Sequence, residues 1–342
     1  MDPVLFTRRA LLAAPFVPTA RPARRDAVHR AIRFMIDVAR TPAHFDEYAP
    51  DLLFCFHSLS EATSDPELRR LCLDAGRERA AHWRTTHPAV PDKAGPVRIS
   101  NLVYACLSVD ALGFPDPAMK AELARRAAQF TAVDFLAFDP LVEGPPSDIP
   151  HRCRKCRKEN VRGVQRCVQC SRKLQMTSRY DVFFEALLAA YFGERYGIQL
   201  GSSLAAVTRW IPSLRPYAWR GRKPDDDFYS LAYTITHILY VHNDYDLRSL
   251  PRADFQQEFD FLHTHFRRNM QMKDPETLGE FIDSLLVLGM PESDPLIREG
   301  MDYILARQNK DGSWGNPKDT DIYNRYHTTW TGIGALMEYR WA

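Results

Sequence analysis

Start and stop signals divide the sequence after residue 26 into segments with apolar residues at helical spacing. Four of these segments follow an Asp-Pro pair, at positions 65–66, 116–117, 274–275 and 294–295. Aspartate can accept hydrogen bonds from the free N–H groups of a first helical turn, where proline is tolerated because its missing N–H has no partner. Long alternating runs of apolar and polar residues, which are typical of strands, are absent. The sequence therefore predicts an all-α fold.

The helical segments number about twelve, enough for six helical hairpins in a chain of 342 residues. They lie near residues 26–41, 45–62, 65–84, 99–112, 116–137, 179–196, 202–211, 226–243, 254–271, 275–288, 294–309 and 325–340. Helical hairpins joined by short loops are compatible with an open solenoid or with a closed α/α toroid.

Every second segment carries two different faces, and this pattern favours the toroid. In the segment 226–243, Leu231 and Ile235 belong to an apolar stripe, whereas Tyr233 and His237 belong to an aromatic and polar stripe. A helix of this kind can pack outward through one stripe and line a central cavity with the other. The remaining segments carry Arg and Glu on their polar faces, as outer helices would. We therefore expect an (α/α)6 toroid of about twelve helices.

Four of the seven cysteines form two Cys-x2-Cys pairs, Cys153 with Cys156 and Cys167 with Cys170, with ten residues between the pairs. Such pairs can supply four thiolates to one tetrahedral Zn²⁺ and leave no open position for water, so the site is expected to be structural. The other cysteines lie singly among apolar residues and are interpreted as small buried side chains. The sequence thus predicts a zinc-ribbon-like insert over residues 150–176.

The insert is also the basic part of the chain. Residues 151–175 hold nine Lys/Arg and one Glu, a formal charge of +8 that leaves −6 for the rest of the chain. Basic residues attract nucleic acids, but they also accompany the negative charge of a four-thiolate zinc site, and the insert lacks the interleaved aromatic residues that would stack on bases. Nucleic acid is therefore not expected as a partner, and a protein could bind through the basic zinc insert.

The first 25 residues differ from the rest of the chain. Arg8 and Arg9 precede a short apolar stretch that is followed by small residues. This pattern resembles a twin-arginine export signal, and the alternative is a disordered arm on a cytoplasmic protein. No uncharged apolar run approaches the ~20 residues that would span a bilayer. The expected parts of the chain are the arm or signal at 1–25, the toroid at 26–149 and 177–342, and the zinc insert at 150–176.

Residues 308–315, with the sequence Gln-Asn-Lys-Asp-Gly-Ser-Trp-Gly, resemble the Gln…Gly-x-Trp element of terpenoid cyclases and protein prenyltransferase β subunits. In that superfamily the element connects an outer helix to the next inner helix. Tyr326-His327-Thr328, followed by the segment 332–336, is similar to the prenyltransferase segment whose histidine binds the catalytic zinc. The resemblance covers residues 296–340 and implies an α/α toroid that acts on an isoprenoid-like substrate.

The same resemblance implies roles for two residues. His327 corresponds to the zinc-binding histidine, although the Asp and Cys that complete the prenyltransferase site have no counterpart here. Asp226, within the sequence Asp225-Asp226-Asp227 at the start of an expected inner helix, would align with the proton-donating Asp of the cyclases. A second metal could be present in the cavity, but nothing else in the sequence supports it.

Polar and aromatic residues on the expected inner faces are candidates for a site in the cavity. The candidate catalytic residues are Asp226, Asp227, His237, Glu280 and His327. The candidate substrate-binding residues are His57, Tyr104, Glu185, Tyr229, Tyr233, Asp283, Tyr326 and Trp330. Tyr233, His237, Glu280, His327 and Trp330 come from three successive inner helices, so we expect their side chains to meet along one wall of the cavity.

These candidates predict an enzyme that performs acid–base or cation-stabilising chemistry on a largely apolar substrate. Aromatic faces attract cations, and Asp226 or a protonated Glu280 could donate the initiating proton. One alternative is a carbohydrate-active enzyme that pairs Glu280 with Glu185 or Asp227. Another is a non-catalytic scaffold that binds a partner protein. An open cavity favours an enzyme, and a cavity filled by side chains favours the scaffold.

Overall fold

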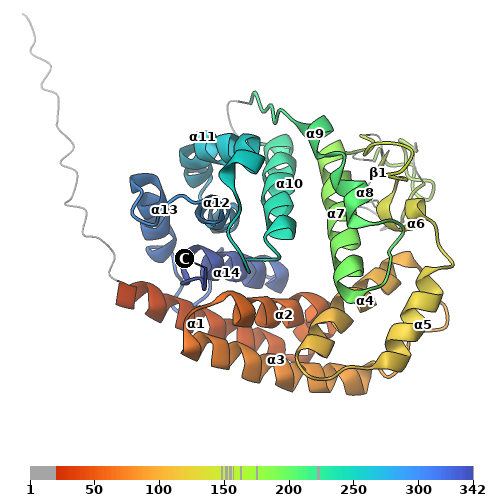
Figure 1. The fold of residues 1–342 in the computed structure, drawn as a ribbon, viewed down its shortest axis with the longest axis horizontal. Helices are drawn as coiled ribbons and strands as arrows, with labels where there is room; N and C mark the ends of the chain where they lie inside the picture. Colours follow the sequence, from red (N-terminus) through yellow and green to blue (C-terminus); the bar gives the residue numbers. More distant parts are fainter. Residues whose placement is uncertain are drawn as a thin grey trace, which may run out of the picture.

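The computed structural model of the protein describes residues 21–341 except 148, 151, 152, 154, 155, 157, 162, 163, 175, 222 and 223. Within these residues the fold is all-helical apart from one pair of two-residue strands (Figure 1). The longer helices are α1 (Arg21–Arg40), α2 (Pro42–Ala62), α3 (Pro66–Thr86), α4 (Pro96–Ala111), α7 (Arg179–Tyr196), α10 (Asp226–His242), α11 (Gln256–Met272), α12 (Pro275–Val287) and α14 (Ile322–Leu336). The shorter ones are α5 (Pro117–Ala127), α6 (Ala132–Leu136), α8 (Leu204–Thr208), α9 (Ile211–Leu214) and α13 (Pro295–Leu305), and a 3-10 turn spans Arg252–Phe255.

The Asp-Pro pairs begin helices, as the sequence predicts. Asp65 accepts hydrogen bonds from the backbone N–H groups of Glu67 and Leu68 at the start of α3. The same kind of cap begins α5, α12 and α13 at Asp116, Asp274 and Asp294. A proline follows each aspartate in the first helical turn, where its missing N–H leaves no partner unsatisfied.

Two of the expected helices are divided in the structure. The segment expected at 116–137 stops at the end of α5, and Thr131 begins α6 through a capping box with Asp134. A capping side chain offers the backbone N–H groups a partner other than the preceding turn, so a new helix starts there. The segment expected at 202–211 forms the short helices α8 and α9, and Pro212 near the start of α9 supplies no N–H for a continuous helix.

Six helices pack as an unbroken sequence of neighbours. The contacts run from α2 to α4, α7, α10, α12 and α14, and α14 in turn contacts α2. Other helices pack against these six, with α3 against α2, and with α11 and α13 against α12 (Figure 1). Helix α1 contacts both α14 and α2, so it covers the place where the last of the six meets the first.

The Gln-to-Trp segment after α13 ties three helices together. The buried Trp314 donates its indole N–H to the carbonyl of Ile304 on α13 at 2.8 Å, and its backbone N–H to Thr329 Oγ1 on α14 at 3.0 Å. The amide of Gln308 donates to the carbonyl of Ala27 on α1 at 2.7 Å. The segment that resembles the cyclase element therefore links α13 and α14 to the first helix of the structure.

Gly332 on α14 leaves room for this tryptophan, and its replacement tests the packing. A Cβ at position 332 would lie 2.7 Å from a carbon of the Trp314 ring, which is fully buried. We expect Gly332→Ala to lower the free energy of unfolding by about 1–3 kcal/mol, because a packed core does not absorb an extra methyl group freely. Urea denaturation measures the effect. A Gly332→Ala variant that is as stable as the wild type would contradict this account.

The insert leaves the helices through β1 (Ile149–Pro150) and returns through β2 (Met176–Thr177), and the two strands pair antiparallel. Its buried residues Cys153, Cys167 and Leu174 form a small core that is separate from the main one. The described part of the insert therefore buries very little apolar surface of its own.

No helix among the described residues is long and apolar enough to cross a membrane. Helix α1 begins at Arg21, so residues 21–25 are helical and continuous with the first long helix. Arg8, Arg9 and the rest of the expected export signal lie outside the described residues.

Candidate functional site

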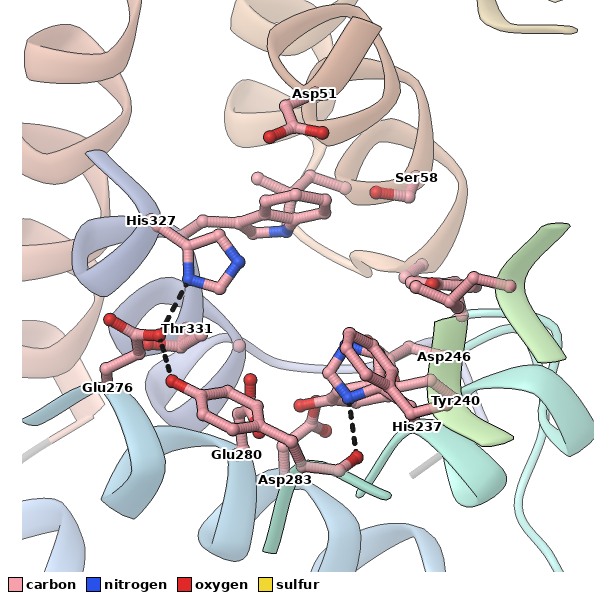
Figure 2. Close-up of a pocket in the computed structure, with 18 of the residues that line it drawn as sticks. Asp51, Ser58, His237, Tyr240, Asp246, Glu276, Glu280, Asp283, His327 and Thr331 are labelled. Atoms are coloured by element: carbon pink, nitrogen blue, oxygen red, sulfur yellow. Dashed lines mark hydrogen bonds and ion pairs between the residues drawn. The ribbon is translucent and has the colours of Figure 1, made fainter. Parts of the chain in front are cut away.

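A cavity of about 500 Å³ lies among the six packed helices, and each of the six contributes to its wall (Figure 2). The polar and charged residues of the lining are Asp51, Ser58, His237, Asp246, Glu276, Glu280, Asp283, Asn324, His327 and Thr331. The aromatic residues of the lining are Tyr104, Phe184, Phe192, Tyr233, Tyr240, Tyr245, Tyr323 and Trp330. The cavity is thus open space with an aromatic and acidic wall.

Glu276, in the first turn of α12, is surrounded by three polar partners. Its Oε1 atom lies 3.0 Å from Nδ1 of His327 and accepts a hydrogen bond from the Tyr233 hydroxyl at 2.5 Å, while Thr328 Oγ1 lies 3.2 Å from Oε2. Burial alone would raise the pKa of Glu276, but these partners lower it to about 2. Burial also opposes the charge of His327, yet Glu276 raises its pKa to about 9. At neutral pH the two residues therefore form an ion pair.

His237, on α10, is held in the opposite protonation state. Its Nδ1 atom lies 2.8 Å from the backbone carbonyl oxygen of Tyr233. Because a carbonyl can only accept, Nδ1 carries the proton and Nε2 is left as an acceptor. Burial lowers the pKa of His237 to about 4, and the charge of His327 acts in the same direction. Figure 2 shows the two rings extending into one cavity from different helices.

Glu280 lies one turn after Glu276 on α12 and is 1% exposed. Its Oε2 atom accepts a hydrogen bond of 2.7 Å from the Thr236 hydroxyl. Burial raises the pKa of Glu280 to about 8, and the negative charge of Glu276 adds to the effect. Glu280 is therefore a neutral carboxylic acid at pH 7, and it can donate a proton into the cavity.

Asp246 and Asp283 form a second group of acids in the wall. Asp283 accepts a 2.5 Å hydrogen bond from the hydroxyl of Tyr339, Asp246 accepts one of 3.0 Å from the amide of Asn243, and the two aspartates also bond to each other. Two carboxyl groups can share a hydrogen bond only when one of them keeps a proton. Burial raises the pKa of Asp283 to about 6 and that of Asp246 well above its ordinary value.

A strained turn after α10 carries Asp246 into this position. The φ angles of Asp244, Tyr245 and Asp246 are 56°, 52° and 72°, in the left-handed region that is unfavourable for residues other than glycine. The carbonyl of Asp246 accepts the indole N–H of Trp341 at 2.8 Å, which helps to fix the turn. Backbone strain of this kind clusters at functional sites, where surrounding contacts maintain it.

The residues that the sequence nominates for the site fall into two groups. Those that line the cavity are Tyr104, Tyr233, His237, Glu280, Asp283, His327 and Trp330. Those that do not line it are His57, Glu185, Asp226, Asp227, Tyr229 and Tyr326. Glu185, Asp226 and Asp227 are exposed. Tyr326 is buried behind the wall, where its hydroxyl donates to Asp51 at 2.9 Å.

Three acidic residues of the wall were not nominated from the sequence. Glu276 could have been found, because it lies four residues before Glu280 and therefore on the same face of one helix. Asp51 follows Pro50, which lies inside α2 beside the non-helical Tyr48, and a helical pattern drawn through this kink does not show which way Asp51 points. Asp246 lies beyond the end of α10, where periodicity carries no signal.

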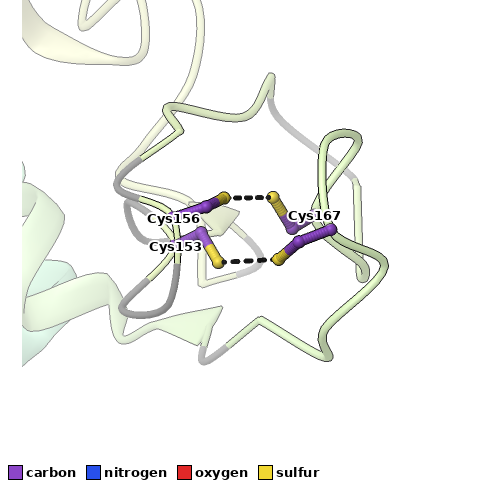
Figure 3. A group of neighbouring side chains, drawn as sticks. Cys153, Cys156 and Cys167 are labelled. Carbon is purple, nitrogen blue, oxygen red and sulfur yellow. Dashed lines mark hydrogen bonds between the residues drawn. The ribbon is translucent and has the colours of Figure 1, made fainter.

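The four cysteines of the insert lie together (Figure 3). Their Sγ atoms are all within 4.8 Å of one another, with 3.5 Å between Cys153 and Cys170 and 3.4 Å between Cys156 and Cys167. Four sulfurs bound tetrahedrally at ~2.3 Å from a Zn²⁺ would be about 3.8 Å apart. The spacing of the thiols thus fits a metal site such as zinc.

The two Cys-x2-Cys turns have matching backbone hydrogen bonds. The N–H of Cys153 donates to the carbonyl of Lys158 at 2.9 Å, and the N–H of Cys167 donates to that of Arg172 at 2.8 Å. Burial would raise the pKa of the Cys167 thiol, but hydrogen bonds from the backbone N–H groups of Gln169 and Cys170 lower this pKa. Such N–H groups orient and stabilise thiolate ligands.

Among the described residues, these cysteines are the only group of three or more His, Cys, Asp or Glu side chains close enough to hold one metal ion. His327, which the resemblance makes a zinc ligand, is instead paired with Glu276. No second metal site is therefore found in the described part of the cavity.

Comparison with known proteins assigns no family, because no family model matches the chain and no curated protein is found to be similar to it. The resemblance to terpenoid cyclases and prenyltransferases thus rests on short motifs, those of the segment 296–340 and the Asp225-Asp226-Asp227 sequence.

Proposed function

We propose that the six helices with unbroken contacts form the inner ring of an (α/α)6 toroid. Two observations support this architecture. Helix α14 contacts α2, so the sequence of neighbours returns to its starting point, and all six helices contribute residues to a single cavity. The long helices that pack against them would form the outer ring.

We also propose that the protein is an enzyme that performs acid–base chemistry on a largely apolar, isoprenoid-like substrate. The observation that carries this proposal is the presence of Glu280, His237 and His327 in one aromatic cavity. At pH 7, Glu280 is a neutral acid, His237 is a neutral base and His327 is a cation. Environments that separate the pKa values of neighbouring groups in this way are typical of active sites.

Glu280 and His237 can each perform one proton transfer of such a reaction. A carboxylic acid with a pKa near the working pH, such as Glu280, can protonate an alcohol, ether or epoxide oxygen of the substrate. Cleavage of the protonated C–O bond releases water from an alcohol, releases an alcohol from an ether, or leaves a hydroxyl group on an opened epoxide. The carbocation that remains would be stabilised by the faces of Tyr104 and Trp330. His237 can accept a proton from the adjacent carbon through Nε2, which yields an alkene and completes the reaction.

The alternatives receive less support from the geometry. The pairings of Glu280 with Glu185 or Asp227 that the sequence offers to a carbohydrate-active enzyme are not supported, because neither Glu185 nor Asp227 lines the cavity. A non-catalytic scaffold would be expected to fill the space between its helices, whereas here about 500 Å³ stays open.

We further propose that the four cysteines bind one structural Zn²⁺. The support is the fit of the sulfur positions to a tetrahedral ion and the matching turns that carry them. Four thiolates fill the coordination sphere, so the ion would supply folding free energy to the insert and no site for a substrate.

The protonation states are tested by ¹⁵N NMR of the imidazole groups. At pH 7 we expect His327 to be doubly protonated and His237 to be neutral with its proton on Nδ1. Glu276→Gln should lower the pKa of His327 from about 9 toward its ordinary value of 6.5, because the charge that holds it is removed. Titration of both wild-type histidines near pH 6.5 would show that the assignment is wrong.

Turnover is tested with a panel of isoprenoid alcohols and epoxides, with products detected by mass spectrometry. We expect Glu280→Gln to reduce the rate by about 10²–10⁴-fold, since the amide has no proton to give. Glu299→Gln is the matched control, because the side chain of Glu299 on α13 is 42% exposed, lies outside the cavity and pairs with Arg267. Equal loss of activity in the two variants would exclude Glu280 as the acid.

A further inference from the structure

The cavity contains far more acidic than basic groups. Five carboxyl side chains line it, and neither Lys nor Arg is among the lining residues. The acids are Asp51, Asp246, Glu276, Glu280 and Asp283. His327 is the one lining cation that the pKa shifts identify, and its charge is already paired with Glu276 at 3.0 Å. Buried carboxylates are normally paired with cations, so the wall of this cavity lacks positive charge.

The rest of the wall is suited to the same kind of ligand. The rings of Tyr104 and Phe192 lie 4.2 Å apart between centroids, and Tyr245 lies 5.8 Å from Phe192. Trp330 lines the cavity from α14. Aromatic faces attract organic cations, and the attraction is stronger where water is displaced. Carboxyl groups and aromatic faces together are the usual surroundings of a bound ammonium group.

We propose that this cavity binds ligands that carry a positive charge, of the organic ammonium class, and rejects anions such as phosphate esters. The inference rests on the cavity of the proposed function and adds the charge of its ligand. A phosphate would meet Asp51 and Glu276 with no Lys or Arg in the wall to pair with it. An ammonium group would supply the positive charge that the wall lacks.

Binding of a cation should also release protons. Glu280 keeps its proton because it is buried beside Glu276, and Asp246 keeps its proton because it is buried beside Asp283. A bound ammonium favours the ionised forms of both acids. The titratable groups that face these acids are Asp274, Glu276, Asp283, His327, Tyr233, Tyr240, Tyr245, Tyr323 and Tyr339. Of these, only His327 is cationic, so a ligand cation changes the balance of charge substantially.

The test compares geranylamine, geraniol and geranyl phosphate, which share one apolar chain and differ in the head group. Isothermal titration calorimetry at pH 7, in two buffers of different ionisation enthalpy, gives the affinity and the number of protons released. We expect geranylamine, whose amine is protonated at this pH, to bind at least about tenfold more tightly than geraniol, and geranyl phosphate to bind most weakly. We also expect a net release of protons with the amine alone.

Variants locate the effect. Asp51→Asn should weaken the binding of geranylamine without weakening the binding of geraniol. The amide oxygen of the asparagine can still accept the hydrogen bond that Tyr326 donates to Asp51. Glu280→Gln should reduce the number of protons released. Asp74→Asn is the control, because Asp74 is an exposed residue of α3 that pairs with Arg70, and it should behave as the wild type does.

The proposal is overturned if geranyl phosphate binds as tightly as geranylamine, if no binding of the amine is detected, or if Asp51→Asn and Asp74→Asn have equal effects. The proposed function fails separately. If geranylamine binds but no member of the panel is turned over, the proposed enzymatic activity is wrong and the preference for cations stands. If panel members are turned over but geranylamine is not preferred, the preference for cations is wrong and the proposed activity stands.

Discussion

Replacement of Cys156 by serine is expected to release zinc from the chain and to unfold the insert, while the helices around the cavity stay folded. The binding free energy of a structural Zn²⁺ in a small domain is on the order of 10 kcal/mol and is the main contribution to its folding. The described part of the insert has little else to hold it, since its small core buries one aliphatic residue, Leu174, with the partly buried Val164 packed against it. That core is separate from the main one, so the effect should be local.

Metal analysis and hydrogen exchange measure the two parts of this result. The native protein should contain one zinc per chain, and Cys156→Ser should contain none and exchange rapidly at the described residues of the insert. Gln169→Ser is the matched control, because Gln169 is an exposed residue of the second Cys-x2-Cys turn and not a ligand. Substoichiometric zinc in the native protein, or slow exchange in the Cys156 variant, would contradict the structural role.

The cysteine cluster and the helix starts could be predicted from the sequence because both depend on local spacing. Two residues between cysteines fix the geometry of a chelating turn regardless of the rest of the chain. An Asp-Pro pair likewise begins a helix through the backbone N–H groups of its own first turn. The helix expected at 116–137 shows the limit of this reasoning. There, Thr131 and Asp134 form a capping box inside a pattern that is otherwise helical.

The site could be predicted only in part, because helical periodicity gives the face of a residue and not its depth. His237, Glu280 and His327 were found because they lie well inside helices with clear apolar stripes. Asp226 lies in the first turn of α10 and is exposed. In a first turn, the face of the helix on which a residue lies no longer determines whether it is buried. Asp246 depends on a left-handed turn after α10, and such a turn is set by tertiary contacts such as that from Trp341.

Glu280→Gln is expected to make the protein more stable at high pH and to leave it nearly unchanged at pH 5. The pKa of Glu280 is raised from an ordinary value of 4.5 to about 8 in the folded protein. The folded state therefore holds this proton more tightly than the unfolded state does, and stability is lost as the pH rises from 4.5 through 8. The shift corresponds to a loss on the order of 5 kcal/mol by pH 9.

Urea denaturation at pH 5, 7 and 9 tests this expectation. The neutral amide has no charge to bury, and its oxygen can still accept the hydrogen bond from Thr236 that Glu280 accepts at 2.7 Å. The pKa of His327 is raised to about 9, so its contribution is also lost as the pH rises above 6.5, and part of the decline should persist in the variant. Glu299→Gln, at a carboxylate outside the cavity, should follow the wild type at every pH. A variant no more stable than the wild type at pH 9 would mean that Glu280 is ionised inside the cavity, and the acid of the proposed reaction would then have to be sought in the pair of Asp246 and Asp283.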